Sequence, residues 1–588
     1  MGTDDFLQLD IFHPGVEVRP WLNTKKTRHI LPGATSSETT FNTIQNWMAD
    51  CLLNHTNCLK PHSPGNDKPL PKRLLELSNG CVVLREDAAH KRHPYACLSH
   101  CWGPSPRRPE STILKTKRAT LEKFKLKVPW DQLTKTFQDA VEICRRLSIN
   151  FLWIDSLCIL QDSIDDWAQN AAEVGSIYEN ALLTIAATKS KEGCEGCYTT
   201  TDLQYHALSV PGCDNICIRK KPPSYPVHEL TLDQSCFPLL DRAWVYQEMH
   251  LSVRILHFCS QEVVWACRSA RKSESGISDA EATNNFQYST DLHGWDTSWK
   301  DLNPIENSLQ NDTRTLWYRI VEEYTRLHIS FPSDIFPALA ALTQRMYNLR
   351  PPQDLFMAGL WKRTLLLDMM WKCPLGQNLG RPPKWRAPTW SWASLQAQVI
   401  WDPQLSSIFE TIQLLDACCE TEGLPEMGNI MVKEGATITL RAPLIKATWL
   451  KPWVRSRWPE ILTSQVNGKI DVNRFYPDYD HDLPGEYHIS WQSVFFLVPI
   501  AISWIPLEDN YEGSRDGPGS YRHLGLGLRR ITENSIGTSS PAVYERIGYV
   551  EIVEEHGEGN LSVQEAQERF ERVSAVLRSL PHISLTII

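Results

Sequence analysis

Residues 130–158 read WDQLTKTFQDAVEICRRLSINFLWIDSLC, and this stretch decides the fold class. Its first part repeats apolar side chains at the helical period from Leu133 to Cys144, which predicts an amphipathic helix over 130–147. Its second part, 151–154, is a short apolar run that is typical of a buried strand. A helix that leads directly into a buried strand indicates a parallel sheet covered by helices.

The segments on either side extend the same pattern. Residues 95–99 predict a strand before this helix, and 165–178 predict a second helix that leads to a strand over 181–187. The expected order is therefore β-α-β-α-β, with right-handed crossovers between parallel strands. Farther along the chain, we expect a short helix over 240–249 and paired strands over 253–258 and 262–265.

Polar residues follow the first two predicted strands. Ser99, His100, Trp102 and Gly103 lie at the end of the first strand, and 155–161 lies at the end of the second. Ligands of open parallel sheets bind beyond the carboxyl ends of the strands, so we expect one site at this edge. The alternative is that Trp102 and Trp153 belong to the core and that Asp155 only caps a turn. Neighbouring strand residues point to opposite faces, so Ser99 and His100 are not expected to form a hydrolase dyad.

The rest of the chain suggests four parts. We expect a helical leader segment over 1–90, the α/β domain over 91–268, a linker with a helical, Trp-rich extension over 269–400, and a β-rich region over 401–588. Within these parts, 270–301 is expected to be a loop, and the apolar run 494–505 is interpreted as two buried strands.

Composition narrows the function classes. The chain of 588 residues has a formal net charge of −9, so a broad electrostatic interface with nucleic acid is not expected. Its longest apolar run is shorter than the roughly 20 residues of a transmembrane helix, so no membrane span is expected. The first ten residues do not resemble a secretory signal, and 17 cysteines then indicate reduced thiols in the cytosol or nucleus, of which we expect the cytoplasm.

Five sequence segments occur in a recognisable order. They are YACLSHCWG (95–103), FLWIDSLCILQD (151–162), IYENA (177–181), DRAWVYQE (241–248) continuing to RILHF (254–258), and APTWSWAS (387–394). In this order they resemble the fungal heterokaryon incompatibility (HET) family. The upstream residues Cys51, His55 and Cys58 and the tail 545–549 are similar to further features of that family.

The resemblance carries expectations about fold and role. HET domains are distantly similar to Toll/interleukin-1-receptor (TIR) domains, which implies a flavodoxin-like or TIR-like parallel sheet. HET proteins act in fungi as effectors of programmed cell death when genetically different hyphae fuse. Some TIR relatives cleave NAD with a glutamate, so NAD is a possible substrate here, and no bound cofactor is expected.

The resemblance also suggests which acids to examine. Relatives often have a glutamate at the position of Asn170, and an amide cannot act as a general base. If the chain consumes NAD, the essential carboxylate is therefore expected to be Glu173 or Glu248, with Asp155 as a further candidate.

Other motif residues have competing interpretations. Cys101 and Cys158 could be nucleophiles, although a buried, inert cysteine is the commoner state. Arg242 could bind a phosphate or a carboxylate of a ligand, or it could pair with Glu248 in a structural role. The remaining motif residues considered for ligand binding are Gln161, Trp244 and Gln247, which join Ser99, His100, Trp102, Gly103, Cys158 and Arg242.

Two cysteine groups resemble metal sites. Cys51, His55 and Cys58 offer only three candidate ligands. Cys194, Cys197, Cys213 and Cys217 have the spacing of a zinc site, but 193–196 reads as a turn, and the family resemblance does not require a metal there. We therefore expect no bound metal.

The leading functional hypothesis is an effector or regulator of heterokaryon incompatibility and programmed cell death in a filamentous fungus. It would act through a protein partner or by self-association. One alternative is an enzyme or accessory protein recruited to another pathway, such as secondary metabolite biosynthesis. Another is a signalling scaffold without catalytic activity.

Overall fold

The computed structural model divides the chain into two compact units. Unit 1 contains Met1–Pro304, Leu327–Ser330 and Ala338–Leu342, and unit 2 contains the remaining residues up to Ile588. The structure describes residues 8–15, 27–59, 71–77, 80–86, 93–103, 113–213, 215–223, 225, 236–281, 306–374, 380–422, 431–449, 461–463, 471–479, 489, 493–506, 519–531, 542–553 and 563–588.

Four parallel strands form the middle of the unit 1 sheet. Their order is β5-β4-β6-β9, so the first strand in the chain lies between the second and the third. The predicted parallel strands are therefore present, and the unit has the mixed α/β content that the sequence predicts. The strands are β4 (Ala96–Ser99), β5 (Phe151–Trp153), β6 (Leu183–Ala186) and β9 (Arg254–Phe258).

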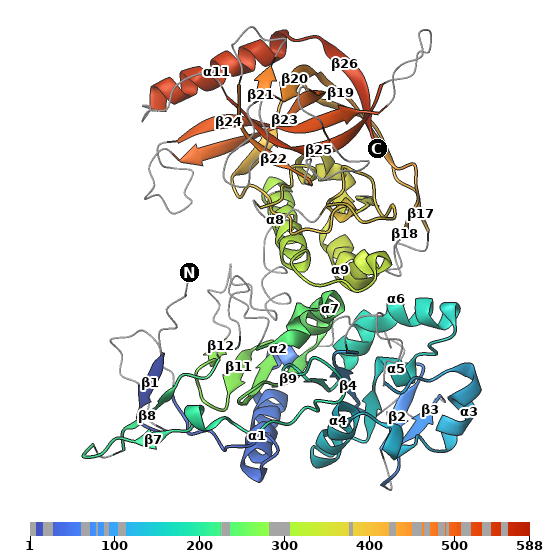
Figure 1. Ribbon diagram of the computed structural model, residues 1–588, viewed down its shortest axis with the longest axis vertical. Coiled ribbons are helices and arrows are strands. Elements are labelled where there is room, and N and C mark those ends of the chain that lie inside the picture. The colour runs from blue at the N-terminus through green and yellow to red at the C-terminus, as the bar shows by residue number, and fades with distance from the viewer. Residues whose placement is uncertain are drawn as a thin grey trace. The chain divides into compact units, whose positions relative to one another are not determined.

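The strand order explains where the helices lie. The crossover from β4 to β5 runs one way along the sheet, and the crossovers from β5 to β6 and from β6 to β9 run the other way. Because such crossovers are right-handed, the first helix must cover one face and the later helices the opposite face. Figure 1 shows this arrangement, with α4 (Lys135–Arg146) on one side of the sheet and α6 (Ile164–Asn180) and α7 (Ala243–Leu251) on the other.

The apolar face of α4 enters the core as the helical period predicts. Phe137, Ala140, Val141 and Cys144 are all fully buried. The helix begins later than predicted, because residues 130–132 form a separate 3-10 turn and Thr134 is extended at the N-cap. The period of apolar residues predicts which face of the helix is buried, but it does not predict the residue at which the helix begins.

Antiparallel strands extend this sheet at both edges, giving the full order β12-β11-β10-β9-β6-β4-β5-β2-β3. The predicted pairing of 253–258 with 262–265 is confirmed as the β9–β10 hairpin. The expectation of a loop over 270–301 is wrong for its first part, because β11 and β12 continue the sheet there; residues 282–301 lie outside the described residues. The added strands are β2 (Leu74–Glu76), β3 (Val83–Arg85), β10 (Val263–Cys267), β11 (Ala270–Ser273) and β12 (Ala280–Glu281).

The leader contains strands as well as helices. Helix α1 (Glu38–Asn54) begins at Ser37, whose side chain accepts a hydrogen bond from the Thr40 amide, and it packs against β10. The short α2 (Thr56–Leu59) follows directly. The other small elements of unit 1 are β1 (Leu9–Phe12), α3 (Arg118–Leu126), α5 (Asp155–Cys158), β7 (Leu208–Ser209) and β8 (Cys217–Lys220).

Unit 2 is built on a largely antiparallel sheet. Its main path is β16-β19-β26-β25-β24-β23-β20-β21, and α11 packs against β24 and β25 (Figure 1). The interpretation of 494–505 as two strands is wrong. This run forms one long strand, β23, whose register shifts between Pro499 and Ala501 because proline cannot donate to the ladder.

The strands of this sheet all lie between residues 405 and 587. They are β15 (Leu405–Ile408), β16 (Gln413–Cys418), β19 (Thr437–Pro443), β20 (Ile445–Trp449), β21 (Ile461–Thr463), β22 (Asp471–Pro477), β23 (Val494–Pro506), β24 (Gly519–Arg530), β25 (Ala542–Val553) and β26 (His582–Ile587). The helices of the region after 305 are α8 (Glu306–Tyr324), α9 (Ala340–Leu349), α10 (Leu365–Asp368) and α11 (Val563–Ser579), and the short strand pairs are β13 (Phe356–Met357) with β14 (Leu360–Trp361) and β17 (Thr421–Glu422) with β18 (Met431–Val432).

Buried tryptophans form much of the unit 2 core. The carbonyl of Gly359 accepts hydrogen bonds from the indoles of both Trp317 and Trp392, each at 2.9 Å. Buried indole N–H groups usually find a hydrogen-bond partner, and here one carbonyl serves two of them; Gly359 has a positive φ of 94°, which glycine adopts readily.

Candidate functional site

The polar motifs after β4 and β5 meet at one edge of the unit 1 sheet, as the sequence predicts. The indole nitrogen of Trp102 donates a hydrogen bond to Asp155 Oδ2 at 2.7 Å. His100 Nε2 lies 3.8 Å from Asp155 Oδ1. Asp155 also caps α5, because its Oδ1 accepts from the Ser156 amide at 2.6 Å. Asp155 therefore combines a local capping role with contacts across the edge.

His100 is a buried, neutral side chain. Burial lowers its pKa, while the nearby Asp155 carboxylate opposes that shift. Its ring packs edge-on against Phe137 of α4, with the centroids 5.0 Å apart. Ser99 instead lies near Glu248 of α7, at the opposite face of the sheet, and lowers the pKa of that carboxyl. This placement agrees with the prediction that Ser99 and His100 do not form a dyad.

Glu248 brings a carboxyl group to the same edge from α7. The residue keeps some exposed surface, but its Oε2 atom is buried. Burial raises its pKa to about 7, and the nearby Ser99, Arg242 and Tyr178 lower it only in part. Asp155 adds to the upward shift because a second negative charge nearby is unfavourable. This carboxyl therefore exchanges its proton near neutral pH.

Several polar atoms of this edge lack partners. Within the described part of the chain, both ring nitrogens of His100, the Ser99 hydroxyl and Glu248 Oε2 are buried without a hydrogen bond of ordinary geometry. Buried polar atoms without partners are costly, and the described residues contain others of this kind in both units. We refer to Ser99, His100, Asp155 and Glu248 as the edge cluster.

Arg242 lies beside the edge cluster without forming the expected pair. Its guanidinium donates to the carbonyl of His100 at 2.5 Å, and it acts on Glu248 only through space. Trp244 stacks edge-on against Trp167 at 6.5 Å. Gln247 is buried in α7, and Gly103 has a positive φ of 102° where the chain leaves the edge.

The contacts and burial of Cys101, Cys158 and Gln161 indicate structural roles. Burial raises the pKa of Cys101 to about 11 and that of Cys158 to about 12, so both remain protonated thiols at neutral pH. Gln161 donates to the carbonyls of Asp155 and Ile159, each at 3.2 Å, and thereby holds the loop after β5.

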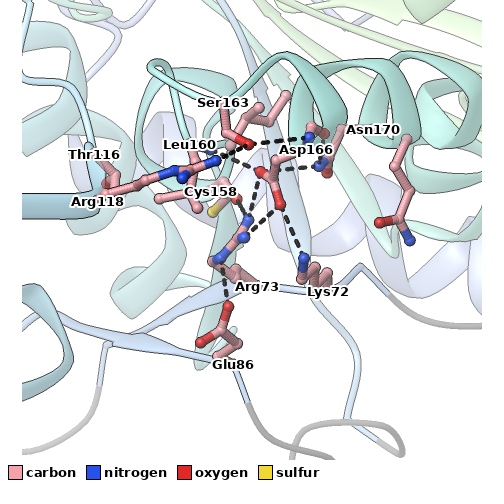
Figure 2. Close-up of polar contacts among 12 residues, drawn as sticks. Lys72, Arg73, Glu86, Thr116, Arg118, Cys158, Leu160, Ser163, Asp166 and Asn170 are labelled. Atoms are coloured by element: carbon pink, nitrogen blue, oxygen red, sulfur yellow. Dashed lines mark hydrogen bonds and ion pairs between the residues drawn. The ribbon is translucent and has the colours of Figure 1, made fainter. Parts of the chain in front are cut away.

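The side chains of Glu173 and Asn170 form their hydrogen bonds within α6. Glu173 is half-buried on α6 and accepts a hydrogen bond from Gln169 at 3.2 Å. Asn170 is buried, and its amide donates to the Asp166 carbonyl at 2.7 Å (Figure 2). The amide at the position where relatives often have glutamate thus stabilises the first turns of its own helix.

The sequence did not predict the ion-pair network that Asn170 joins. Arg73 is fully buried and binds both carboxylate oxygens of Asp166, at 2.6 and 3.0 Å, as well as the Cys158 carbonyl at 2.8 Å (Figure 2). Burial alone would raise the pKa of Asp166, but Arg73, the Leu160 amide and Lys72 together lower it to about 2. Arg73 lies on the approach to β2, and no motif spacing links it to 166.

Comparison with known protein families finds a match, and it covers the segment that contains this edge of the sheet. Residues 95–248 match the family model of the heterokaryon incompatibility protein (HET). The HET segment begins at β4 and ends at Glu248, so it contains the whole edge cluster. No curated protein and no solved structure gave a significant match.

Two other motifs lie outside the HET segment and meet within unit 2. The Arg546 amide donates to Thr389 Oγ1 at 3.0 Å, which joins the tail 545–549 to the motif 387–394. The fully buried Arg546 guanidinium also pairs with Asp478 at 3.0 Å and binds the Trp371 carbonyl at 2.5 Å. These motifs therefore share a structural role in unit 2.

The described residues contain one group of side chains with metal-binding geometry, and it lies away from the edge cluster. It consists of Cys51, His55, Cys58 and Cys267. Cys194, Cys197, Cys213 and Cys217 form no such group within the part of the chain that the structure describes. No described helix is long and apolar enough to cross a membrane.

Proposed function

We propose that this chain is an effector or regulator of heterokaryon incompatibility that promotes programmed cell death in a filamentous fungus. The match of residues 95–248 to the HET family supports the assignment. We expect it to act in the cytoplasm, with a protein partner or a second copy of itself.

We further propose that the edge cluster is the functional centre of the HET segment. The strand order β5-β4-β6-β9 is the order expected for the first four strands of a flavodoxin-like or TIR-like core. In such sheets the ligand binds where the crossovers diverge, which here is between β4 and β6. Ser99 is the last residue of β4, and His100 follows it at this point.

The single observation that carries the proposal is the buried Glu248 carboxyl, which lies near Ser99 and Arg242 at the end of β4 and has a raised pKa of about 7. A carboxyl that ionises near pH 7 is suited to proton transfer or to stabilising positive charge in a bound molecule.

NAD is the substrate that this chemistry and the TIR analogy favour. Hydrolysis breaks the bond between ribose C1′ and the nicotinamide nitrogen and forms a bond from C1′ to a water oxygen. Nicotinamide leaves as a neutral ring, and the water releases one proton. Positive charge builds on the ribose during this step, and a fixed carboxylate stabilises it. Glu248 suits this role better than Glu173, which lies outside the edge cluster.

The test is NAD turnover by the purified full chain. Wild type and Glu173→Gln are expected to release nicotinamide at similar rates, whereas Glu248→Gln should lose at least 100-fold, a loss in the range that charge stabilisation supplies. Asn170→Ala should retain activity per folded molecule. Turnover that survives Glu248→Gln would refute the assignment of the carboxylate. If wild type shows no turnover, the non-catalytic scaffold is favoured.

A further inference from the structure

The fold gathers four metal-ligating side chains that are distant in sequence. Cys51 and Cys58 Sγ, His55 and Cys267 Sγ offer one ligand atom each, and these four atoms all lie within 4.8 Å of one another. Cys267 Sγ lies 3.3 Å from His55 Nδ1. In a tetrahedral zinc site, with ligands about 2.0–2.3 Å from the ion, neighbouring ligand atoms are about 3.5–3.8 Å apart.

Secondary structure accounts for this grouping. Cys51 and His55 are one helical turn apart at the end of α1, so they share a face. Cys58 is the buried residue of α2. Cys267 is the last residue of β10, against which α1 packs. The expectation of no metal rested on three ligands in 51–58, and β10 supplies the fourth.

The surroundings orient His55 for metal binding. Its Nε2 lies 3.5 Å from Asp50 Oδ2, while its Nδ1 faces Cys267. A carboxylate at one ring nitrogen holds the proton there and leaves the lone pair of the other nitrogen toward the metal, which is the usual arrangement of zinc-bound histidines.

A buried cation balances the sulfur ligands. Arg254 Nε donates to Cys51 Sγ at 3.3 Å, and its Nη2 donates to the Cys58 carbonyl at 2.9 Å. Three thiolates and one neutral imidazole around Zn²⁺ leave one net negative charge, which this guanidinium offsets.

We propose that Cys51, His55, Cys58 and Cys267 bind one structural zinc ion. The four ligands fill a tetrahedral shell and leave no open position for a substrate, so the ion would have no catalytic role. It would fasten the leader helices α1 and α2 to the β9–β10 hairpin. These elements flank the HET segment on both sides in sequence, so the metal closes a long loop around it.

The experiment is elemental analysis of the full chain purified under reducing conditions from zinc-supplemented cells. Wild type is expected to contain about one zinc per chain, as four ligands around one ion require. Cys267→Ser should lose most of it. Cys197→Ser is the matched control, because Cys197 is another buried thiol that lies outside the group.

Two further measurements keep the proposal falsifiable if Cys267→Ser folds poorly. Asp50→Asn keeps all four ligands and is expected to weaken zinc affinity about 10–100-fold in a chelator competition. Metal-free wild type reloaded with Co²⁺ should show the visible absorption of a tetrahedral, sulfur-ligated ion. Wild type that takes up neither zinc nor cobalt, or Cys267→Ser that retains full zinc, would overturn the proposal.

Discussion

At the scale of single residues, the edge cluster keeps groups that a stable core would avoid. Burial raises the pKa of the Glu248 carboxyl to about 7, and burial of the His100 ring lowers the pKa of that imidazole. Each of these features costs stability, because a desolvated polar group loses its hydrogen bonds to water. Such costs concentrate where a protein binds or transforms a ligand.

This cost predicts the pH dependence of the Glu248→Gln variant. The folded pKa is raised above the unfolded value of about 4.3, so the carboxyl opposes folding increasingly as the pH rises from about 4.5 to 7. Relative to wild type, Glu248→Gln should gain about 2–3 kcal/mol of stability between pH 5 and pH 8. Urea unfolding at both pH values measures this. The control Glu173→Gln should show no such gain, and an equal gain in both variants would contradict the assignment.

Asp166 has the opposite linkage. Its pKa is lowered to about 2, so its contribution is present above the unfolded value of about 3.9 and is lost as the pH falls from about 4 to 2. Wild type should lose about 2 kcal/mol more than Asp166→Asn over this range. Acid titration of the unfolding free energy measures the difference. Asp165→Asn, an exposed neighbour, should follow wild type; if Asp166→Asn does so too, the Arg73 pairing is not stabilising.

Residues whose partners are identified by a nearby sequence pattern could be predicted, whereas residues whose partners are distant in sequence could not. Ser99, His100 and Asp155 were expected at one edge because each lies at or just after the end of a strand of recognisable pattern. Glu173 and Glu248 remained equivalent candidates, because the sequence does not show which face of a helix meets the strand ends. Cys267 and Arg73 were missed because their partners lie on other strands and helices with no periodic relation to them.

At the scale of elements, two glycines in the unit 2 sheet leave space for the ring of a buried phenylalanine. Gly527 and Gly548 face each other in the β24–β25 register. A methyl group added at Gly548 would lie 2.5 Å from the Phe475 ring, and one at Gly527 would lie 2.6 Å from it. The two glycines therefore leave a hollow that the buried Phe475 fills.

Gly548→Ala should destabilise unit 2 by about 1–3 kcal/mol, because the ring and the new methyl group cannot both fit. Phe475→Leu in the same chain should recover part of the loss, so the double variant is expected to be more stable than the sum of the single changes implies. Thermal unfolding of the four proteins provides the cycle. Strict additivity would show that ring and glycine do not interact.

Elements were predicted best where one face is apolar at a regular period. The helix α4 and the strands β4, β5 and β6 meet that condition. The single strand β23 was divided in two because Pro499 reads as a strand end, although a shift in register accommodates it. Strands β11 and β12 were missed because charged and small residues dominate 270–281.

At the scale of the whole molecule, the chain holds two compact units with separate sheets. The HET match lies in unit 1, and the motifs 387–394 and 545–549 lie in unit 2, where they share the Arg546 contacts. Asp478 and Arg546 form an ion pair with no exposed surface in that unit.

Removal of one partner of a buried ion pair leaves an uncompensated charge. Asp478→Ala is therefore expected to destabilise unit 2 by about 3–5 kcal/mol. Calorimetry should show that its unfolding transition shifts to a lower temperature, while the transition of unit 1 stays in place. Asp416→Ala, at an exposed strand position in the same unit, is the control. Equal shifts in unfolding temperature for both variants would show that loss of the buried ion pair destabilises unit 2 no more than loss of an exposed carboxylate.

The central claim is that the edge cluster of the HET segment carries the biological activity. The most direct measurement is expression of the full chain in a filamentous-fungus host, with viability and cellular NAD scored at equal protein levels. Wild type and Glu173→Gln are expected to reduce both, and Glu248→Gln is expected to reduce neither. Cell death from Glu248→Gln at the wild-type level would contradict the claim.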